Sequence, residues 1–234
     1  NWRAYMRLDK LFLKMFRLEP HIPVRLMLDI SASMYAGNER KLLFAKKLAA
    51  AFCYVALVKL ETITIEPFSD RLGERFIAGG GRHRFAPVSH FLEGLQPGGP
   101  TDFFSVVRQF CGRYTQPGLL LVISDFLEAR TIVEPLQYLA NYGHELMLVH
   151  VWDNEDRVPP WLGDLQLIDA ETGQELPLEV DEEARDSYTR EFDQHCANVR
   201  QTALRHGGRW VGLTTDLPLE EAIFGPLSQA RGVQ

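Results

Sequence analysis

The sequence predicts an α/β fold in three layers, in which a mostly parallel sheet lies between two layers of helices. Short apolar segments alternate along the chain with segments of helical periodicity, and residues 119–124 and 145–151 are almost wholly apolar. Strands that are covered on both faces have this continuous hydrophobic character, which is typical of parallel sheets. A chain of 234 residues is long enough for one such Rossmann-like domain with an insertion.

The first expected elements surround a short polar turn. A strand at 24–29 ends at Asp29, and a long buried helix is expected at 39–60. Thr101 stands where the N-cap of a later helix belongs. The other expected elements are a strand at 62–68, an antiparallel edge strand at 71–77, helices at 88–95, 102–114 and 132–142, strands at 119–124 and 145–151, an inserted β-hairpin at about 165–180, a polar helix at 181–206, a strand at 209–215 and a closing helix at 218–227.

Composition excludes several classes of function. The formal net charge of −6 argues against nucleic acid as the main partner, because phosphate binding needs clustered Lys and Arg. The three cysteines form no C-x-x-C pair, and we expect Cys53 and Cys111 to be buried thiols in a reducing compartment. The longest apolar run, residues 48–58, is far shorter than the roughly 20 residues of a membrane span. These features predict a cytoplasmic protein, with membrane association only through residues outside this chain.

Two polar groups outside the main site are expected to be structural. Asp153 follows the strand at 145–151, and we expect it to cap the next segment. Residues 82–84, Arg-His-Arg, follow three glycines but lack the spacing of a phosphate-binding loop, so they predict a mobile surface loop.

Five oxygen-bearing side chains fall where three predicted loops should meet. Asp29, Ser31 and Ser33 follow the first strand, Thr101 lies in a Gly-Gly-Pro-Thr-Asp loop, and Asp125 ends the strand at 119–124. Ligands of open α/β sheets bind at the carboxyl ends of the strands, so we expect these residues to converge.

These side chains predict a site for a hard divalent cation, Mg²⁺ first and Mn²⁺ or Ca²⁺ as substitutes. The hydroxyls of Ser31, Ser33 and Thr101 can bind the ion directly, whereas Asp29 and Asp125 can bind directly or through water. A shell rich in neutral hydroxyls would leave the ion able to accept an Asp or Glu carboxylate from a protein partner. One alternative stays open, in which Ser31 and Ser33 cap the following helix and Asp29 braces the turn.

The pattern Asp29-Ile-Ser-Ala-Ser-Met34, together with Thr101 and Asp125, resembles the metal-ion-dependent adhesion site of von Willebrand factor A domains. Residues 1–14 and 169–174 are similar to the bacterial family called domain of unknown function 58, so that the resemblance covers nearly the whole chain. It implies a lead-in segment at 1–20 and a von Willebrand factor A-like domain at 21–234. Many members carry amino-terminal membrane helices, and the sequence at hand shows none.

The resemblance also implies a task. It implies a non-enzymatic, metal-dependent protein-binding module that works with a MoxR-type AAA+ ATPase in chaperone-like assembly or maturation. The competing hypothesis is a Mg²⁺-dependent phosphohydrolase with Asp29 as nucleophile. Against it, Ser31 stands where such enzymes place a second carboxylate, and no lysine is visibly positioned to hold a phosphoryl group. A third hypothesis is a structural domain whose metal only braces the loops.

Overall fold

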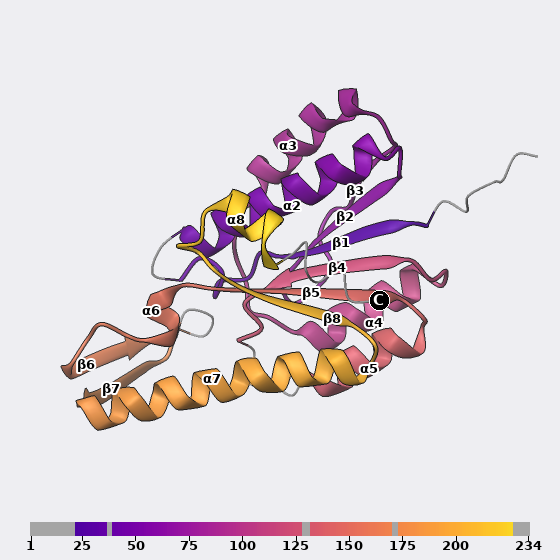
Figure 1. Cartoon of the computed structure of the whole chain (residues 1–234). Coiled ribbons are helices and arrows are strands. Elements are labelled where there is room, and N and C mark those ends of the chain that lie inside the picture. The colour runs from indigo at the N-terminus through magenta and orange to yellow at the C-terminus, as the bar shows by residue number, and fades with distance from the viewer. Residues whose placement is uncertain (1–21, 37–38, 128–131, 170–172, 227–234) are drawn as a thin grey trace, which may run out of the picture.

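The computed structural model describes residues 22–36, 39–127, 132–169 and 173–226 and confirms the predicted fold class. Its main sheet has six strands in the order β3-β2-β1-β4-β5-β8 (Figure 1). All neighbouring pairs are parallel except β2 and β3, which are antiparallel. The strands are β1 (Val24–Asp29), β2 (Ile63–Phe68), β3 (Phe76–Ala78), β4 (Leu119–Ser124), β5 (Glu145–Trp152) and β8 (Arg209–Thr214).

Helices cover both faces of this sheet (Figure 1). One face packs against α2 (Arg40–Val58), α3 (Phe85–Gly94) and the short α8 (Leu219–Phe224). The other packs against α4 (Phe103–Arg113), α5 (Val133–Asn141) and α7 (Glu182–Arg205). Alternate residues of one strand serve the two cores, because successive side chains of a strand point to opposite faces. In β1, for example, Leu26 and Leu28 join the α2 side and Met27 joins the α4 side.

Two inner strands, β4 and β5, have the burial that their apolar sequences predict. Residues 120–124 of β4 and 146–151 of β5 are buried, and Leu120 is paired with Leu146 across the ladder. Burial on both faces removes these side chains from water and stabilises the sheet through the hydrophobic effect. Cys53 and Cys111 are buried free thiols, as predicted, and burial raises the pKa of Cys53 to about 12.

Several predicted boundaries are wrong in instructive ways. The N-cap of α4 is Asp102, not Thr101, because the Asp102 carboxylate accepts a hydrogen bond from the backbone N–H of Ser105 at 2.9 Å. The edge strand is shorter than expected, since only residues 76–78 pair with β2 and Leu72 makes an isolated bridge to Phe68. The expected loop at 82–84 is a 3₁₀ turn, η1 (Arg82–Arg84), which leads directly into α3.

The predicted hairpin exists, but it forms a separate two-stranded sheet and is not joined to the edge of the main one. Strands β6 (Gly163–Ile168) and β7 (Glu175–Val180) project beyond α6 (Asn154–Arg157), beside the first turns of α7 (Figure 1). Asp153 caps α6 as predicted, through a reciprocal pair of bonds with Asp156. The lead-in segment 1–20 lies outside the described residues. Across the part of the chain that the structure covers, no helix is both long and apolar enough to span a membrane.

Candidate metal centre

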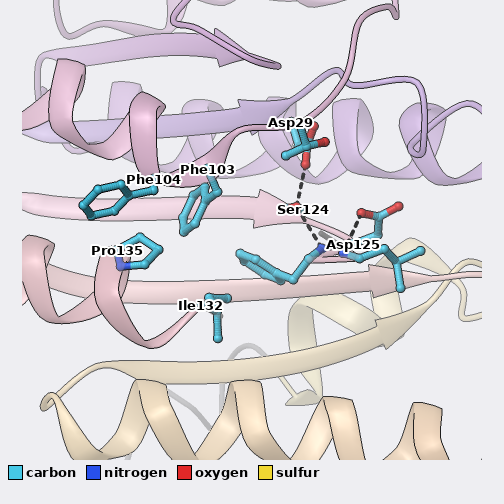
Figure 2. A pocket seen from close by; sticks show the side chains of 10 residues that line it. Asp29, Phe103, Phe104, Ser124, Asp125, Ile132 and Pro135 are labelled. Atoms are coloured by element: carbon cyan, nitrogen blue, oxygen red, sulfur yellow. Dashed lines mark hydrogen bonds between the residues drawn. The ribbon is translucent and has the colours of Figure 1, made fainter. Parts of the chain in front are cut away.

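The predicted site lies where β1 and β4 end side by side. These strands are parallel neighbours, with Leu28 opposite Ile123, so Asp29 and Ser124 meet at the same edge of the sheet. The Ser124 hydroxyl donates a hydrogen bond of 2.5 Å to Oδ2 of Asp29. Figure 2 shows Ser124 between the two carboxylates of Asp29 and Asp125.

The loop that carries Thr101 is attached to the turn after β1 by two backbone hydrogen bonds. Ala32 N–H donates to the carbonyl of Gly99, and Gly98 N–H donates to the carbonyl of Ile30, both at 2.9 Å. Thr101 lines a small cavity together with Asp29 and Asp125. The three loops therefore converge, as the positions of the strand ends predicted.

Four of the five predicted residues form a continuous hydrogen-bonded chain. The backbone N–H of Ser31 donates to Oδ1 of Asp29 at 2.9 Å, and its hydroxyl lies 3.0 Å from that of Ser33. The Ser33 hydroxyl donates to Oδ1 of Asp125 at 3.2 Å. Two loops separated by more than ninety residues of sequence are thereby held together by short polar side chains.

Asp29 is fully buried, which has an electrostatic consequence. Burial, and after it the nearby charge of Asp125, raises the pKa of Asp29 to about 7, although hydrogen bonds from Ser124 and Ser31 act in the opposite direction. Two carboxylates this close in a dry environment repel each other when both are ionised. A cation placed between them would favour the ionised form of both.

The donor set fits a small, hard divalent cation. Adjacent ligands of an octahedral Mg²⁺ at about 2.1 Å lie roughly 2.9 Å apart, close to the distance between the Ser31 and Ser33 hydroxyl oxygens. A cavity of about 30 Å³ lies beside Asp29, Thr101 and Asp125, but its other lining residues are mostly apolar, and Ser31 and Ser33 do not line it. In the described part of the chain no three His, Cys, Asp or Glu side chains group together, so the site would rely on hydroxyls beside its two carboxylates. That these residues bind metal stays a prediction.

The alternative in which Ser31 and Ser33 cap the following helix is wrong, whereas the expectation that Asp29 braces the turn is confirmed. Helix α2 begins at Arg40 with Glu39 in the N-cap position, far beyond Ser31 and Ser33. The serines therefore do not cap it. Asp29 does brace the turn, through the backbone N–H of Ser31.

Sequence reasoning missed Lys41, which the structure places in the site. Its ammonium lies 2.9 Å from Oδ2 of Asp125 and 3.1 Å from Oδ2 of Asp156. Burial alone would lower the pKa of Lys41, but the attraction of these two carboxylates outweighs it and the net shift is upward, so the ammonium stays charged. A signal existed, because Lys41 shares the buried face of α2 with Ala45 and Leu48, and lysine is almost never buried without a partner.

Sequence reasoning also missed the residues that shape the turn after Asp125. The Ser124 hydroxyl accepts a hydrogen bond of 2.9 Å from the backbone N–H of Phe126, and the Phe126 carbonyl lies 2.8 Å from Nε2 of His195 in α7. Phe126 has a φ of 48°, which is uncommon for a residue with a side chain. These contacts hold the left-handed turn that directs Asp125 toward Ser33.

Comparison with known proteins agrees with this description. A family model described as "Protein of unknown function DUF58" matches residues 1–198. The uncharacterized protein Rv1480 of Mycobacterium tuberculosis is 34% identical over 99 residues, which are 42% of this chain and 31% of that protein. An uncharacterized protein of Mycobacterium avium, MAV169, has the same identity over 99 residues, 58% of its own length. The matched region is thus about a third to somewhat over half of these relatives.

Solved structures support the fold. A von Willebrand factor type A protein from Catenulispora acidiphila aligns with a TM-score of 0.53 and 10% identity over 90% of this chain and 42% of its own. An aerotolerance-related membrane protein from Bacteroides fragilis aligns with a TM-score of 0.50 and 15% identity over 91% of this chain and 100% of its own. At such low identity the likeness shows the von Willebrand factor A-like fold alone.

Proposed function

Because the chain belongs to the DUF58 family, whose function is unknown, we propose its task from the site: a non-enzymatic, metal-dependent protein-binding module. Ser31, Ser33 and Thr101 would hold Mg²⁺, or Mn²⁺ or Ca²⁺ in its place, while Asp29 and Asp125 would hold it directly or through water. The ion would supply an electrophilic position for a carboxylate of a protein partner.

One observation carries this proposal. Two serine hydroxyls lie 3.0 Å apart, between a fully buried carboxylate on one strand end and a second buried carboxylate on the next. Where Asp29 and Asp125 act through water, the direct ligands are neutral hydroxyls, so the ion keeps its attraction for an anion from outside. This arrangement favours the capture of an acidic side chain.

The partner that the family resemblance suggests is a MoxR-type AAA+ ATPase, with which the module would act in chaperone-like assembly or maturation. An exposed Asp or Glu on the ATPase would complete the coordination of the ion. We place the module in the cytoplasm, where any membrane association would depend on residues outside this chain.

The decisive experiment is titration of the metal-free chain with Mg²⁺ and Mn²⁺ by calorimetry. The parent protein is expected to bind one ion, and the double variant Ser31→Ala/Ser33→Ala is expected to lose this binding. Ser89→Ala, in α3, is the matched control and should bind as the parent does, since the Ser89 hydroxyl donates a hydrogen bond to Glu93 of its own helix. A parent protein that binds neither ion would overturn the proposal.

A second experiment tests the partner. The purified MoxR-type ATPase encoded nearest to this gene should bind the immobilised chain in Mg²⁺ and be released by EDTA. Binding that survives EDTA and the double serine substitution would show a contact that does not use the ion, and this part of the proposal would then be wrong.

One observation favours the phosphohydrolase alternative, and another argues against it. Lys41 provides the cation near the site that the sequence did not reveal. However, Asp29 is 0% exposed, and its two oxygens accept hydrogen bonds from Ser124 and Ser31, which leaves it poorly placed for attack on a substrate. Hydrolysis of p-nitrophenyl phosphate that requires Mg²⁺ and is lost in Asp29→Asn would establish the alternative.

A further inference from the structure

The buried ammonium of Lys41 already occupies part of the candidate metal site. It contacts Oδ2 of Asp125, while Ser33 and the backbone N–H of Leu127 donate to Oδ1 of the same carboxylate. Each oxygen of Asp125 therefore has a donor without any metal. Only 3% of the Lys41 side chain and 2% of the Asp125 side chain are exposed, so water screens this pair very little.

The position of Lys41 in its helix argues against a role in helix stability. Lys41 is the second residue of α2, at the end of the helix where the macrodipole is positive and acidic residues are preferred. Its burial adds a desolvation cost. Asp125 and Asp156 compensate for both effects, which indicates that the ammonium serves the site and not the helix.

We propose that Lys41 sets the cation affinity of this site, as a fixed positive charge that competes with the divalent ion for Asp125. With Lys41 in place, the negative charge of Asp125 is largely neutralised, and an arriving ion is repelled by the ammonium. The ion then binds weakly to the isolated chain, and a carboxylate from the partner supplies the further negative charge that strengthens its binding. This inference rests on the proposed function and specifies how that site is regulated.

Thermodynamic linkage makes the consequence reciprocal. If a partner carboxylate strengthens ion binding, the ion strengthens binding of the carboxylate by the same factor. Lys41 enlarges this coupling, because it weakens the binding of the ion in the absence of the partner. The module would therefore hold its metal firmly only while it holds its partner.

The test compares Mn²⁺ binding to the parent chain and to three variants by calorimetry. Lys41→Met removes the charge and is expected to bind Mn²⁺ at least about tenfold more tightly, because charges several ångströms apart in a poorly screened site interact strongly. Lys41→Arg keeps the charge and should bind Mn²⁺ more weakly than Lys41→Met does. Lys47→Met makes the same change on the exposed face of α2 and is the matched control.

A residue that only positioned Asp125 would give the opposite result. Lys41→Met would then bind Mn²⁺ more weakly than the parent, and equal or weaker binding overturns the inference while leaving the metal-binding proposal intact. If neither the parent nor Lys41→Met binds Mn²⁺, the proposed function fails and this inference fails with it. A parent that binds Mn²⁺ weakly and a Lys41→Met variant that binds it at least about tenfold more tightly would support both.

Folding of the variants provides a second readout. Without Lys41, the buried Asp125 carboxylate lacks its cation, so Mn²⁺ should raise the melting temperature of Lys41→Met more than that of the parent. Lys41→Gln is the second variant in case Lys41→Met does not fold. Variants that fold only in Mn²⁺ would show that the ion replaces the ammonium, whereas variants that fold in neither condition would show a structural lysine and refute the inference.

Discussion

The Ser33 hydroxyl donates a hydrogen bond of 3.2 Å to Oδ1 of Asp125, although 92 positions of sequence separate the two residues. This bond closes the gap between the turn after β1 and the end of β4. It exists because the two strands are parallel neighbours that end at the same edge. The candidate site is thus a product of sheet topology. Substitution of the side chains that connect its loops should therefore destabilise it most.

Ser124 is one of these connecting residues, and Ser124→Ala should destabilise the protein. The substitution removes the donor to the buried Asp29 carboxyl and the acceptor of the Phe126 N–H. Loss of such buried partners costs about 1–3 kcal/mol. Urea denaturation in EDTA measures the change, and Ser89→Ala at the surface of α3 is the control. A loss no larger than that of the control would show that Ser124 does not hold the site together.

A second buried polar network lies away from the site and gives a test of stability alone. Glu66 is fully buried in β2 and accepts hydrogen bonds from Arg113, at 2.8 and 3.1 Å, and from the Tyr114 hydroxyl at 2.5 Å. Arg113→Met removes the cation that compensates the carboxylate. We expect a loss of about 2 kcal/mol in unfolding free energy, less than for a fully buried pair because Arg113 is 36% exposed.

The matched control for this network is Arg108→Met, which makes the same change at an exposed position of α4. It should cost less than about 0.5 kcal/mol, as most surface substitutions do. If both variants lose the same stability in urea denaturation, the Glu66 network contributes nothing of its own. Metal binding should be unchanged in both, since neither residue touches the site.

The sequence predicted the fold well because its signals are local. Continuous apolar runs at 119–124 and 145–151 indicate strands covered on both faces, and each strand ends near the first polar residues that follow its run. The convergence of Asp29 and Asp125 followed from the rule that parallel strands end at one edge. The N-cap of α4 was assigned to the wrong residue because Thr101 and Asp102 are adjacent and both able to cap.

The missed residues depend on pairing that no local pattern contains. Ser124 reaches Asp29 only because β1 lies beside β4 in a particular register. Lys41 reaches Asp125 only because α2 begins under the same loop. Its position on an apolar helix face could have indicated a buried partner, but the identity of Asp125 and Asp156 as partners required the three-dimensional structure.

Stability should depend on pH through His144. Burial, with a further contribution from Arg25, lowers the pKa of His144 below its usual value of about 6.5. The folded protein then binds this proton less readily than the unfolded chain does. This contribution is present above the unfolded pKa and is lost as pH falls below about 6.5, so His144 by itself lowers the melting temperature between pH 7 and pH 5. His150, whose pKa is lowered by burial to about 3, acts in the same direction, whereas the raised pKa of Asp29 acts in the opposite direction.

The variant His144→Gln removes this titrating group, so its melting temperature at pH 5, relative to pH 7, should be higher than that of the parent. His90→Gln, at an exposed position of α3, is the control and should have the pH dependence of the parent. A pH profile of His144→Gln that matches the parent would show that other groups cause the dependence. Differential scanning calorimetry without metal, in buffers of constant ionic strength, gives the comparison.

The hairpin of β6 and β7 should exchange its backbone amide hydrogens much faster than the central strands do. Almost all of its residues are exposed or partly exposed, whereas β4 and β5 are buried along most of their length. A two-stranded hairpin is marginally stable by itself, and local opening is easiest where few apolar groups are buried. Its attachment relies on α6, whose Arg157 forms an ion pair with Asp193 of α7 at 2.6 Å.

Hydrogen exchange followed by mass spectrometry measures this difference peptide by peptide. Peptides within 163–168 and 175–180 should exchange by local opening, and those of β4 and β5 only by opening of the whole domain. Mg²⁺ should slow exchange in the turn after β4, because a bound ion would join Ser33 to Asp125, and should leave the hairpin unaffected. Protection of the hairpin equal to that of β4 would contradict this expectation and would indicate that the hairpin and the sheet unfold as one unit.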